Sequence, residues 1–304
     1  MWTEAEIQRL KFDVLVVKQH VSSVFKVDVS DFDSRAASAA VKVIEKDLLT
    51  SKDFNLEVEV EVEVLSLLAS RPLTEVGKRV PQLLHAWEDE KKIFVAMPYL
   101  RGCQLQRLFI EFPMLDMAFI VDIAKQLVEI VQYLHEEVGI VHRDLKLSNV
   151  LVSPAGVVYL VDLGSAWPVN RGVPPTVCGT KHIRPPEAWR SIWSGTKYDF
   201  WAFGNLMFEL ATTKPVTGDF NRGSGELELA WMPGFPEAID KGDEWIAFKD
   251  LVIRLLAVDP SRRLSDWQVV KEHPFFAGCD WGLQNQYTSV APYEEEIEDQ
   301  LLGL

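Results

Sequence analysis

The sequence has few cysteines and fewer basic than acidic residues. Its three cysteines, Cys103, Cys178 and Cys279, are odd in number and far apart among 304 residues. This excludes a disulfide framework and the close spacing of a zinc site, so a reducing compartment is expected. The 31 Lys and Arg against 45 Asp and Glu give a formal net charge of −14. That charge argues against a protein that holds nucleic acid through phosphate contacts, and it favours basic partners.

Long hydrophobic runs are also absent. No uninterrupted apolar stretch approaches the roughly 18 residues of a membrane-spanning helix. The opening segment, MWTEAEIQRLKFD, is charged and has no signal-peptide core. We therefore expect an intracellular protein, cytoplasmic or nuclear, with neither membrane nor nucleic acid among its partners, and we expect a monomer.

Hydrophobic residues nonetheless make up 48% of the chain, enough for a real core. The first hundred residues are rich in β-branched and aromatic runs, at 12–17, 22–29, 39–46 and 92–100. Helical patterns follow, most clearly at 117–137, 198–213 and 244–259. We predict an α+β protein with a β-rich lobe over 1–100, a helical lobe over 101–282 and an acidic tail over 283–304, with a hinge at Pro98–Gly102.

The segment NLEVEVEVEVLSLLASR, residues 55–71, fits two structures. Its alternation of Val and Glu favours a half-buried strand by period alone. Val58, Val62 and Leu65 also share one face of a helix. The pattern by itself leaves both structures open.

The segment GIVHRDLKLSNVLV, residues 139–152, sets charged residues and an asparagine between apolar runs. A surface loop would not need these apolar neighbours, and a buried segment would not tolerate unpaired charges. The surrounding motifs offer an explanation. HRDLKLSNV, VDLG, RPPEAW, YDFWAFG and DPSRRLS follow one another along the chain.

Together these motifs resemble the ordered signatures of the protein kinase superfamily: HRDLKxxN, DFG, APE, DxWxxG and a late arginine. The resemblance covers about residues 12–282. VKVIEKDLL, TVCGT and HPFFAGCDW are similar to segments of the AGC group, and of protein kinase C most of all. The resemblance implies a bilobal fold, with one long helix in the small β-rich lobe and a larger, mainly helical lobe. It also implies Mg²⁺-dependent phosphoryl transfer from ATP to protein Ser/Thr hydroxyls.

The resemblance gives each polar residue of the central segment a role. Phosphoryl transfer requires positioning and charge neutralisation from the protein. Asp144 would be the catalytic base, Lys146 would steady the phosphoryl group, and Thr180 would contact both. Asn149 and Asp162, brought together by a hairpin through SPAG, would supply oxygen ligands for Mg²⁺. The alternative is a buried polar network that only holds the loop in place.

Lys42 lies in the apolar run AAVKVIEK. Its family position makes it the lysine of the α- and β-phosphates, although a lone lysine in such a strand is usually a snorkelling edge residue. The expected ion-pair partner is Glu61, which predicts a helix over 53–69. Glu57 and Glu63 are alternative partners, and a solvated acidic face is the structural alternative.

The segment AMPYL is the expected hinge of an ATP site. Met97 would guard the back of the adenine pocket. The carbonyl of Pro98 and the N–H of Leu100 would bind the adenine. Pro98 lacks an N–H, but the family uses only the carbonyl at this position.

The glycine-rich loop is the main departure from the family. Its pattern, GxGxxGxV, covers the phosphates with backbone N–H groups that side chains would obstruct. Counting back from Lys42 places His20, Ser22 and Phe25 where glycines belong. A pseudokinase that binds or scaffolds without efficient turnover is therefore the alternative function. A small-molecule phosphotransferase is disfavoured by the motifs PPEAW and DFWAFG. A smaller departure from the family is Leu163, which replaces the Phe of the DFG motif in VDLG.

Regulatory and structural roles also follow from the resemblance. Thr176 matches the AGC phosphorylation site, where a phosphate would pair with Arg143 and order the loop. An unmodified threonine is the alternative. Glu187 and Arg263 correspond to a buried ion pair, and Asp199 would accept backbone hydrogen bonds from the catalytic loop.

The substrate is less well defined. Basophilic AGC kinases carry acids where Gln104 and Ser148 stand, and Lys181 and Ile183 replace a proline and an aromatic residue. The negative net charge still favours a basic protein substrate. The acidic end YEEEIEDQ predicts a solvated tail.

Overall fold

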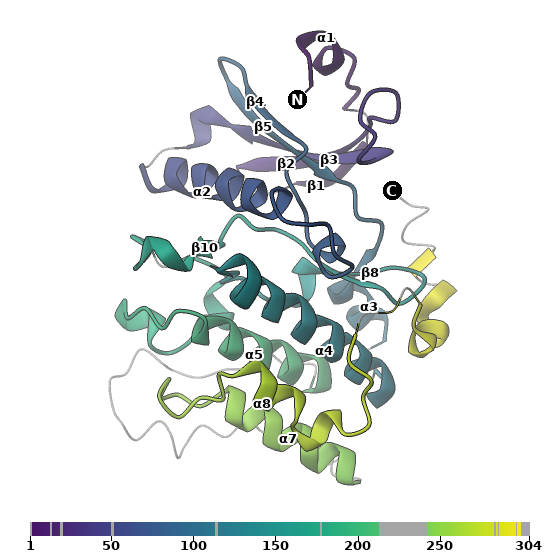
Figure 1. The fold of residues 1–304 in the computed structure, drawn as a ribbon, viewed down its shortest axis with the longest axis vertical. Coiled ribbons are helices and arrows are strands. Elements are labelled where there is room, and N and C mark those ends of the chain that lie inside the picture. Colours follow the sequence, from purple (N-terminus) through teal and green to yellow (C-terminus); the bar gives the residue numbers. More distant parts are fainter. Residues whose placement is uncertain are drawn as a thin grey trace.

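The computed structural model describes residues 2–12, 14–18, 21–49, 52–112, 115–176, 178–212, 242–282, 284, 286–295 and 297–298. Figure 1 shows a lobe with a β-sheet above a larger lobe of helices. This arrangement confirms the predicted α+β bilobal class. Among the described residues, no helix combines the length and apolar character needed to cross a membrane.

The small lobe is built on a five-stranded antiparallel sheet in the order β1-β2-β3-β5-β4. Its strands are β1 (Val14–Lys18), β2 (Ser22–Asp28), β3 (Ser38–Glu45), β4 (His85–Glu88) and β5 (Lys92–Pro98). Four of them match predicted runs, whereas β4 was not predicted. β3 pairs with β5 from Ala39 to Glu45, and the predicted hinge begins at Pro98, the last residue of β5.

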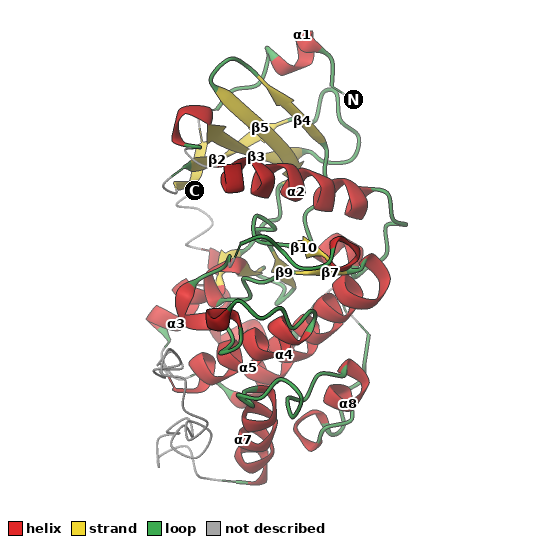
Figure 2. Cartoon of the chain, turned by 90° about the vertical axis from the view of Figure 1, so that its left-hand side faces the viewer, coloured by secondary structure: helices red, strands yellow, loops and turns green. Residues whose placement is uncertain are grey.

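Helix α2 (Lys52–Ala69) crosses one face of this sheet (Figures 1 and 2). Val60, Val64 and Leu68 are buried, and their spacing of four places them on one side of the helix. The strand favoured by the Val–Glu period is therefore wrong, and the predicted helix is present. The alternation of Val and Glu mispredicts this segment because valines at every second position also include the spacing of four that a helix face needs.

The opposite face of the sheet is covered by the N-terminal segment, which includes helix α1 (Glu4–Ile7) (Figure 2). Trp2 is buried beside Phe32, and its indole N–H donates to Asp33 at 2.7 Å. Phe12 packs edge-on against Phe25 of β2. The first residues thus belong to the small lobe's second core.

The large lobe holds α3 (Leu105–Glu111), α4 (Met117–Gln132), α5 (Lys197–Thr212), α7 (Asp243–Leu255) and α8 (Trp267–Lys271). The helix predicted over 117–137 is α4 followed by a π-helical turn, η3 (Tyr133–Val138), which ends at Gly139 with a φ of 81°. Short strands form two small sheets, in the orders β6-β8-β9 and β7-β10. They are β6 (Cys103–Gln104), β7 (Ile140–Val141), β8 (Val150–Val152), β9 (Val158–Leu160) and β10 (Trp167–Pro168). The β8–β9 pair is the predicted hairpin.

Short 3-10 turns complete the described elements. They are η1 (Lys46–Leu48), η2 (Gly77–Arg79), η4 (Leu147–Asn149), η5 (Val169–Arg171), η6 (Lys181–Ile183), η7 (Ala188–Arg190), η9 (Pro274–Phe276) and η10 (Thr288–Tyr293). Two of them lie beside predicted site residues: η4 follows Lys146, and η6 follows Thr180.

The C-terminal segment differs from the predicted solvated tail. Val290, Tyr293 and Ile297 are buried, and their spacing of three and four places them on one helical face. The N–H of Tyr287 donates to the carbonyl of Ala155 at 2.8 Å, in the β8–β9 turn. Burying these apolar side chains outweighs the solvation of their acidic neighbours, which remain exposed at Glu294, Glu295 and Glu298.

Candidate active site

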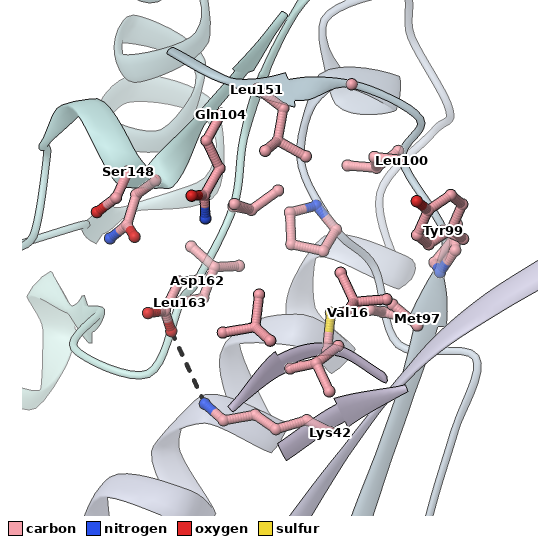
Figure 3. A pocket seen from close by; sticks show the side chains of 18 of the residues that line it. Val16, Lys42, Met97, Tyr99, Leu100, Gln104, Ser148, Leu151, Asp162 and Leu163 are labelled. Atoms are coloured by element: carbon pink, nitrogen blue, oxygen red, sulfur yellow. Dashed lines mark ion pairs between the residues drawn. The ribbon is translucent and has the colours of Figure 1, made fainter. Parts of the chain in front are cut away.

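A cavity of about 400 Å³ is lined by residues of both lobes. Val16, Val24 and Ala40 contribute from the sheet, and Leu151 and Val161 contribute from the β8–β9 side (Figure 3). The volume and apolar walls suit a small ligand. Polar side chains gather at one end.

Lys42 stands at the polar end of the cavity. It lies on the same face of β3 as Ala40, and its Nζ donates to both carboxylate oxygens of Glu61 on α2 at 2.8 Å. Asp162 Oδ1 lies 3.7 Å from the same Nζ, the pair drawn as a dashed line in Figure 3. Burial opposes the charged form of Lys42, but the two carboxylates raise its pKa above the ordinary value. Lys42 therefore stays a cation.

Asp144 is held from several sides. Thr180 N–H donates to its Oδ1 at 2.8 Å, and Lys146 Nζ lies 2.7 Å from its Oδ2. Lys146 also donates to the Thr180 hydroxyl at 2.8 Å. Burial would raise the pKa of Asp144, but the hydrogen bond and charge of Lys146 and the Thr180 N–H lower it. The carboxylate is thus ionised and able to accept a proton.

The loop that carries Asp144 is fixed by Asp199 of α5. Asp199 is fully buried, and its two oxygens accept the backbone N–H groups of His142 at 2.7 Å and Arg143 at 2.8 Å. Arg143 has a φ of 64°, a left-handed conformation that a non-glycine residue rarely adopts. These hydrogen bonds stabilise that strained loop, as expected for Asp199.

Asn149 and Asp162 offer the oxygen atoms that a magnesium ion requires. The Asn149 amide nitrogen donates to the backbone carbonyl of Asp144 at 2.9 Å, which leaves the amide oxygen as a possible ligand. The N–H of Val161 donates to the Asn149 carbonyl at 2.9 Å, so the hairpin brings the two ligand candidates together. Both side chains line the cavity. An amide oxygen and a carboxylate fit the preference of Mg²⁺ for oxygen ligands.

The predicted hinge residues Met97, Pro98 and Leu100 all line the cavity, Met97 and Leu100 being labelled in Figure 3. Tyr99 directs its N–H to the carbonyl of Ser38 at 2.9 Å, so the hinge is tied to the start of β3. Gln104 and Ser148, which stand at the positions of the family's acids, also line the cavity.

The described residues of 163–187, here called the activation segment, contact both lobes. Arg143 donates to the backbone carbonyl of Thr176 at 3.4 Å. The Thr176 hydroxyl lies 3.1 Å from the thiol of Cys178, which donates to Glu57 of α2 at 2.7 Å. Arg171 pairs with Glu63 of the same helix. Glu57 and Glu63 therefore bind the activation segment and are not partners of Lys42.

The predicted ion pair of Glu187 and Arg263 is present and buried. Arg263 donates through Nη1 and Nη2 to the two Glu187 oxygens at 2.6 and 2.8 Å. The side chains are 0% and 4% exposed for Arg263 and Glu187. This bidentate contact ties the end of the activation segment to the large lobe.

A family model described as "Protein kinase domain" matches residues 21–276. The chain belongs to the protein kinase family. Protein kinase C delta type of Homo sapiens is 26% identical over 276 residues, 90% of this chain and 39% of that protein. Ribosomal protein S6 kinase alpha-4 of Mus musculus is 30% identical over 276 residues, 86% of this chain and 34% of that protein.

Protein kinase C-like 1 of Caenorhabditis elegans is 30% identical over 281 residues, 90% of this chain and 38% of that protein. The chain therefore spans between about a third and two fifths of the length of these three relatives. Their names support the AGC resemblance of this kinase domain.

The register of the kinase's glycine-rich loop corrects the predicted glycine positions. Val24 lines the cavity and pairs with Lys42, so it matches the final Val of GxGxxGxV. Counting back from Val24 places the glycine positions at Val17, Gln19 and Ser22. Phe25 instead packs on the far face of the sheet, against Phe12. His20 and Gln19 lie outside the described residues, and the family's glycines are absent in either register.

Other parts of the kinase site were not predicted. The contact between Glu57 and Cys178 was missed because the two residues lie 121 positions apart and no sequence pattern relates them. Lys18 and Arg107, two exposed cations that line the cavity, were also missed. The sequence did offer a signal for Lys18, because it is a charged residue directly after the apolar Val16 and Val17.

Proposed function

We propose that this protein is a Mg²⁺-ATP-dependent serine/threonine kinase that phosphorylates protein substrates. The observation that carries the proposal is the position of Asp144. Its ionised carboxylate is held by Thr180 and Lys146, and it accepts a hydrogen bond from Asn149, which lines the cavity between the two lobes. The TVCGT motif and the protein kinase C and S6 kinase relatives support serine/threonine specificity.

The residues divide the work of phosphoryl transfer. The apolar walls around Val24 and Leu151 would hold the purine, and Lys42 would bind phosphate oxygens. Asn149 and Asp162 would hold Mg²⁺, which when bound neutralises phosphate charge. Asp144 would orient the substrate hydroxyl and accept its proton, because its low pKa keeps it ionised.

Two measurements test this proposal: the thermal shift caused by Mg²⁺-ATP, and transfer of radiolabelled phosphate to a mixed basic protein substrate. We expect Asp144→Ala to reduce transfer by about 10²–10⁴-fold while the thermal shift persists. Asp162→Ala should reduce the thermal shift itself. The exposed Asp31→Asn is the control and should change neither. Full transfer by Asp144→Ala would contradict the proposed role.

The missing glycines favour one alternative, a pseudokinase. Val17 and Ser22 carry side chains where backbone N–H groups would cover the phosphates. Mg²⁺-ATP could raise the melting temperature of the unmodified protein while no radiolabelled phosphate reaches either the protein or the substrates. That result would favour the pseudokinase. Transfer that depends on Asp144 would exclude it.

A further inference from the structure

One peptide group joins the candidate catalytic base to the activation segment. Its N–H belongs to Thr180 and donates to Asp144 Oδ1 at 2.8 Å. Its carbonyl belongs to Gly179 and accepts two hydrogen bonds from Arg184, through Nε at 3.0 Å and Nη2 at 2.7 Å. A continuous chain of hydrogen bonds therefore runs from the Arg184 guanidinium through one peptide group to Asp144.

The backbone at Gly179 is built for this orientation. Its φ is +83°, which glycine adopts without strain. A Cβ at this position would lie 2.4 Å from the carbonyl oxygen of Arg143, so no side chain fits there. The preceding carbonyl, that of Cys178, accepts a hydrogen bond from Tyr198 at 3.2 Å. The peptide group is thus confined on both sides.

Arg184 is well suited to act on this peptide group. It is partly buried, and its guanidinium lies over the ring of Trp189 at 5.4 Å. It forms no ion pair with a carboxylate among the described residues, so both donors go to the Gly179 carbonyl. A hydrogen bond from a cation is stronger than one between neutral groups. It also polarises the peptide, which makes the opposite N–H a better donor.

We propose that Arg184 is a positioning residue for the catalytic base. Its guanidinium fixes and polarises the Gly179–Thr180 peptide group, and that group fixes one oxygen of Asp144 while Lys146 holds the other at 2.7 Å. The inference rests on the proposed function, in which Asp144 accepts the substrate proton. In this role Arg184 acts on the base through the peptide group.

The first test reads the hydrogen bond directly, in nucleotide-free protein labelled with ¹⁵N-threonine. A strong hydrogen bond shifts an amide proton downfield. We expect the Thr180 amide proton to move upfield in Arg184→Ala and to return part of the way in Arg184→Lys, which restores one charged donor. Arg190→Ala removes the same charge from an exposed site six residues on and should leave the resonance in place. An unchanged resonance in Arg184→Ala overturns the inference.

The second test is kinetic. Arg184→Ala should lower kcat about 10–100-fold, the size expected for a misplaced catalytic group, and leave the KM for ATP unchanged. Arg184→Lys should recover part of the lost kcat, because it restores one charged donor to the Gly179 carbonyl. A loss confined to KM, or an unchanged kcat in Arg184→Ala protein that unfolds at the normal temperature, overturns the inference alone. Full transfer by Asp144→Ala overturns the proposed function, and this inference with it.

Discussion

Lys42 Nζ donates to both carboxylate oxygens of Glu61 at 2.8 Å, joining strand β3 to helix α2 at the polar end of the cavity. We predict that Lys42→Met weakens Mg²⁺-ATP binding at least about tenfold, since a charge-assisted phosphate contact is lost. The unfolding free energy should fall by about 1–3 kcal/mol, because buried Glu61 loses its partner. Calorimetric titration and urea unfolding measure the two effects.

Helix α2 supplies a matched control for this pair. Glu57 lies one turn before Glu61 and contacts Cys178 rather than Lys42. Glu61→Gln should therefore weaken nucleotide binding, whereas Glu57→Gln should leave it unchanged. Equal losses in the two variants would mean that the acidic face of the helix acts only through its overall charge.

The pH dependence of transfer tests the contact between Asp144 and Lys146. Burial raises the pKa of Asp144, but Lys146 and the Thr180 N–H lower it below the ordinary value. The base is active when ionised, so the acidic limb of kcat/KM should lie below the ordinary range of an aspartate. Lys146→Met removes a hydrogen bond and a charge, so the limb should move to higher pH. A limb that stays in place would show that another group controls it.

Helix α2 shows what the sequence could and could not decide. Hydrophobic period favoured a strand, because valines at every second position satisfy that pattern as well as a helical one. The resemblance to protein kinases, in which the strand lysine pairs with a glutamate on the next helix, selected the helix and Glu61, and both are present. Family position thus resolved a segment that local periodicity misread.

The two ends of the chain and the glycine-rich loop could not be placed in this way. The loop register depends on the length of the connection between β2 and β3, which sets Val24 opposite Lys42 and which counting along a sequence misses. Trp2 and Tyr293 are buried only because distant segments form the surfaces that receive them. Acidic neighbours concealed the apolar spacing of the C-terminal segment.

The buried pair of Glu187 and Arg263 should contribute strongly to stability when one partner is removed. Arg263→Ala leaves a carboxylate that is 4% exposed without its bidentate partner. We predict a loss of about 3–5 kcal/mol in unfolding free energy, measured by urea denaturation. The double variant Glu187→Gln with Arg263→Met should recover part of this loss, because no charge is then left buried. A double variant less stable than Arg263→Ala would contradict this account.

Packing of the C-terminal segment is tested at Tyr293. Its ring contacts Phe119 of α4 at 4.7 Å and Phe112 at 5.1 Å between centroids. Tyr293→Ala should lower the unfolding free energy by about 2–4 kcal/mol through lost burial and a cavity. The exposed neighbour Glu294→Ala should change it by less than about 0.5 kcal/mol. Equal, small changes in unfolding free energy in the two variants would mean that this segment is a solvated tail.

Asp33 links the N-terminal segment to the sheet and should make stability depend on acid pH. Burial would raise its pKa, but hydrogen bonds from Arg35 and Trp2 lower it from 3.8 to about 2. Because the folded pKa lies below the unfolded one, the contribution is complete above about pH 4 and disappears as the pH falls towards 2. We expect Asp33→Asn to lower the unfolding free energy by about 1–2 kcal/mol at pH 7, a range reduced because Arg35 is half exposed.

Urea unfolding at several pH values measures this effect. The difference in unfolding free energy between Asp33→Asn and the unmodified protein should shrink between pH 5 and about pH 3. Asp31→Asn should show no difference at either pH. A gap that stays constant over this range would mean that the carboxylate acts through shape rather than charge.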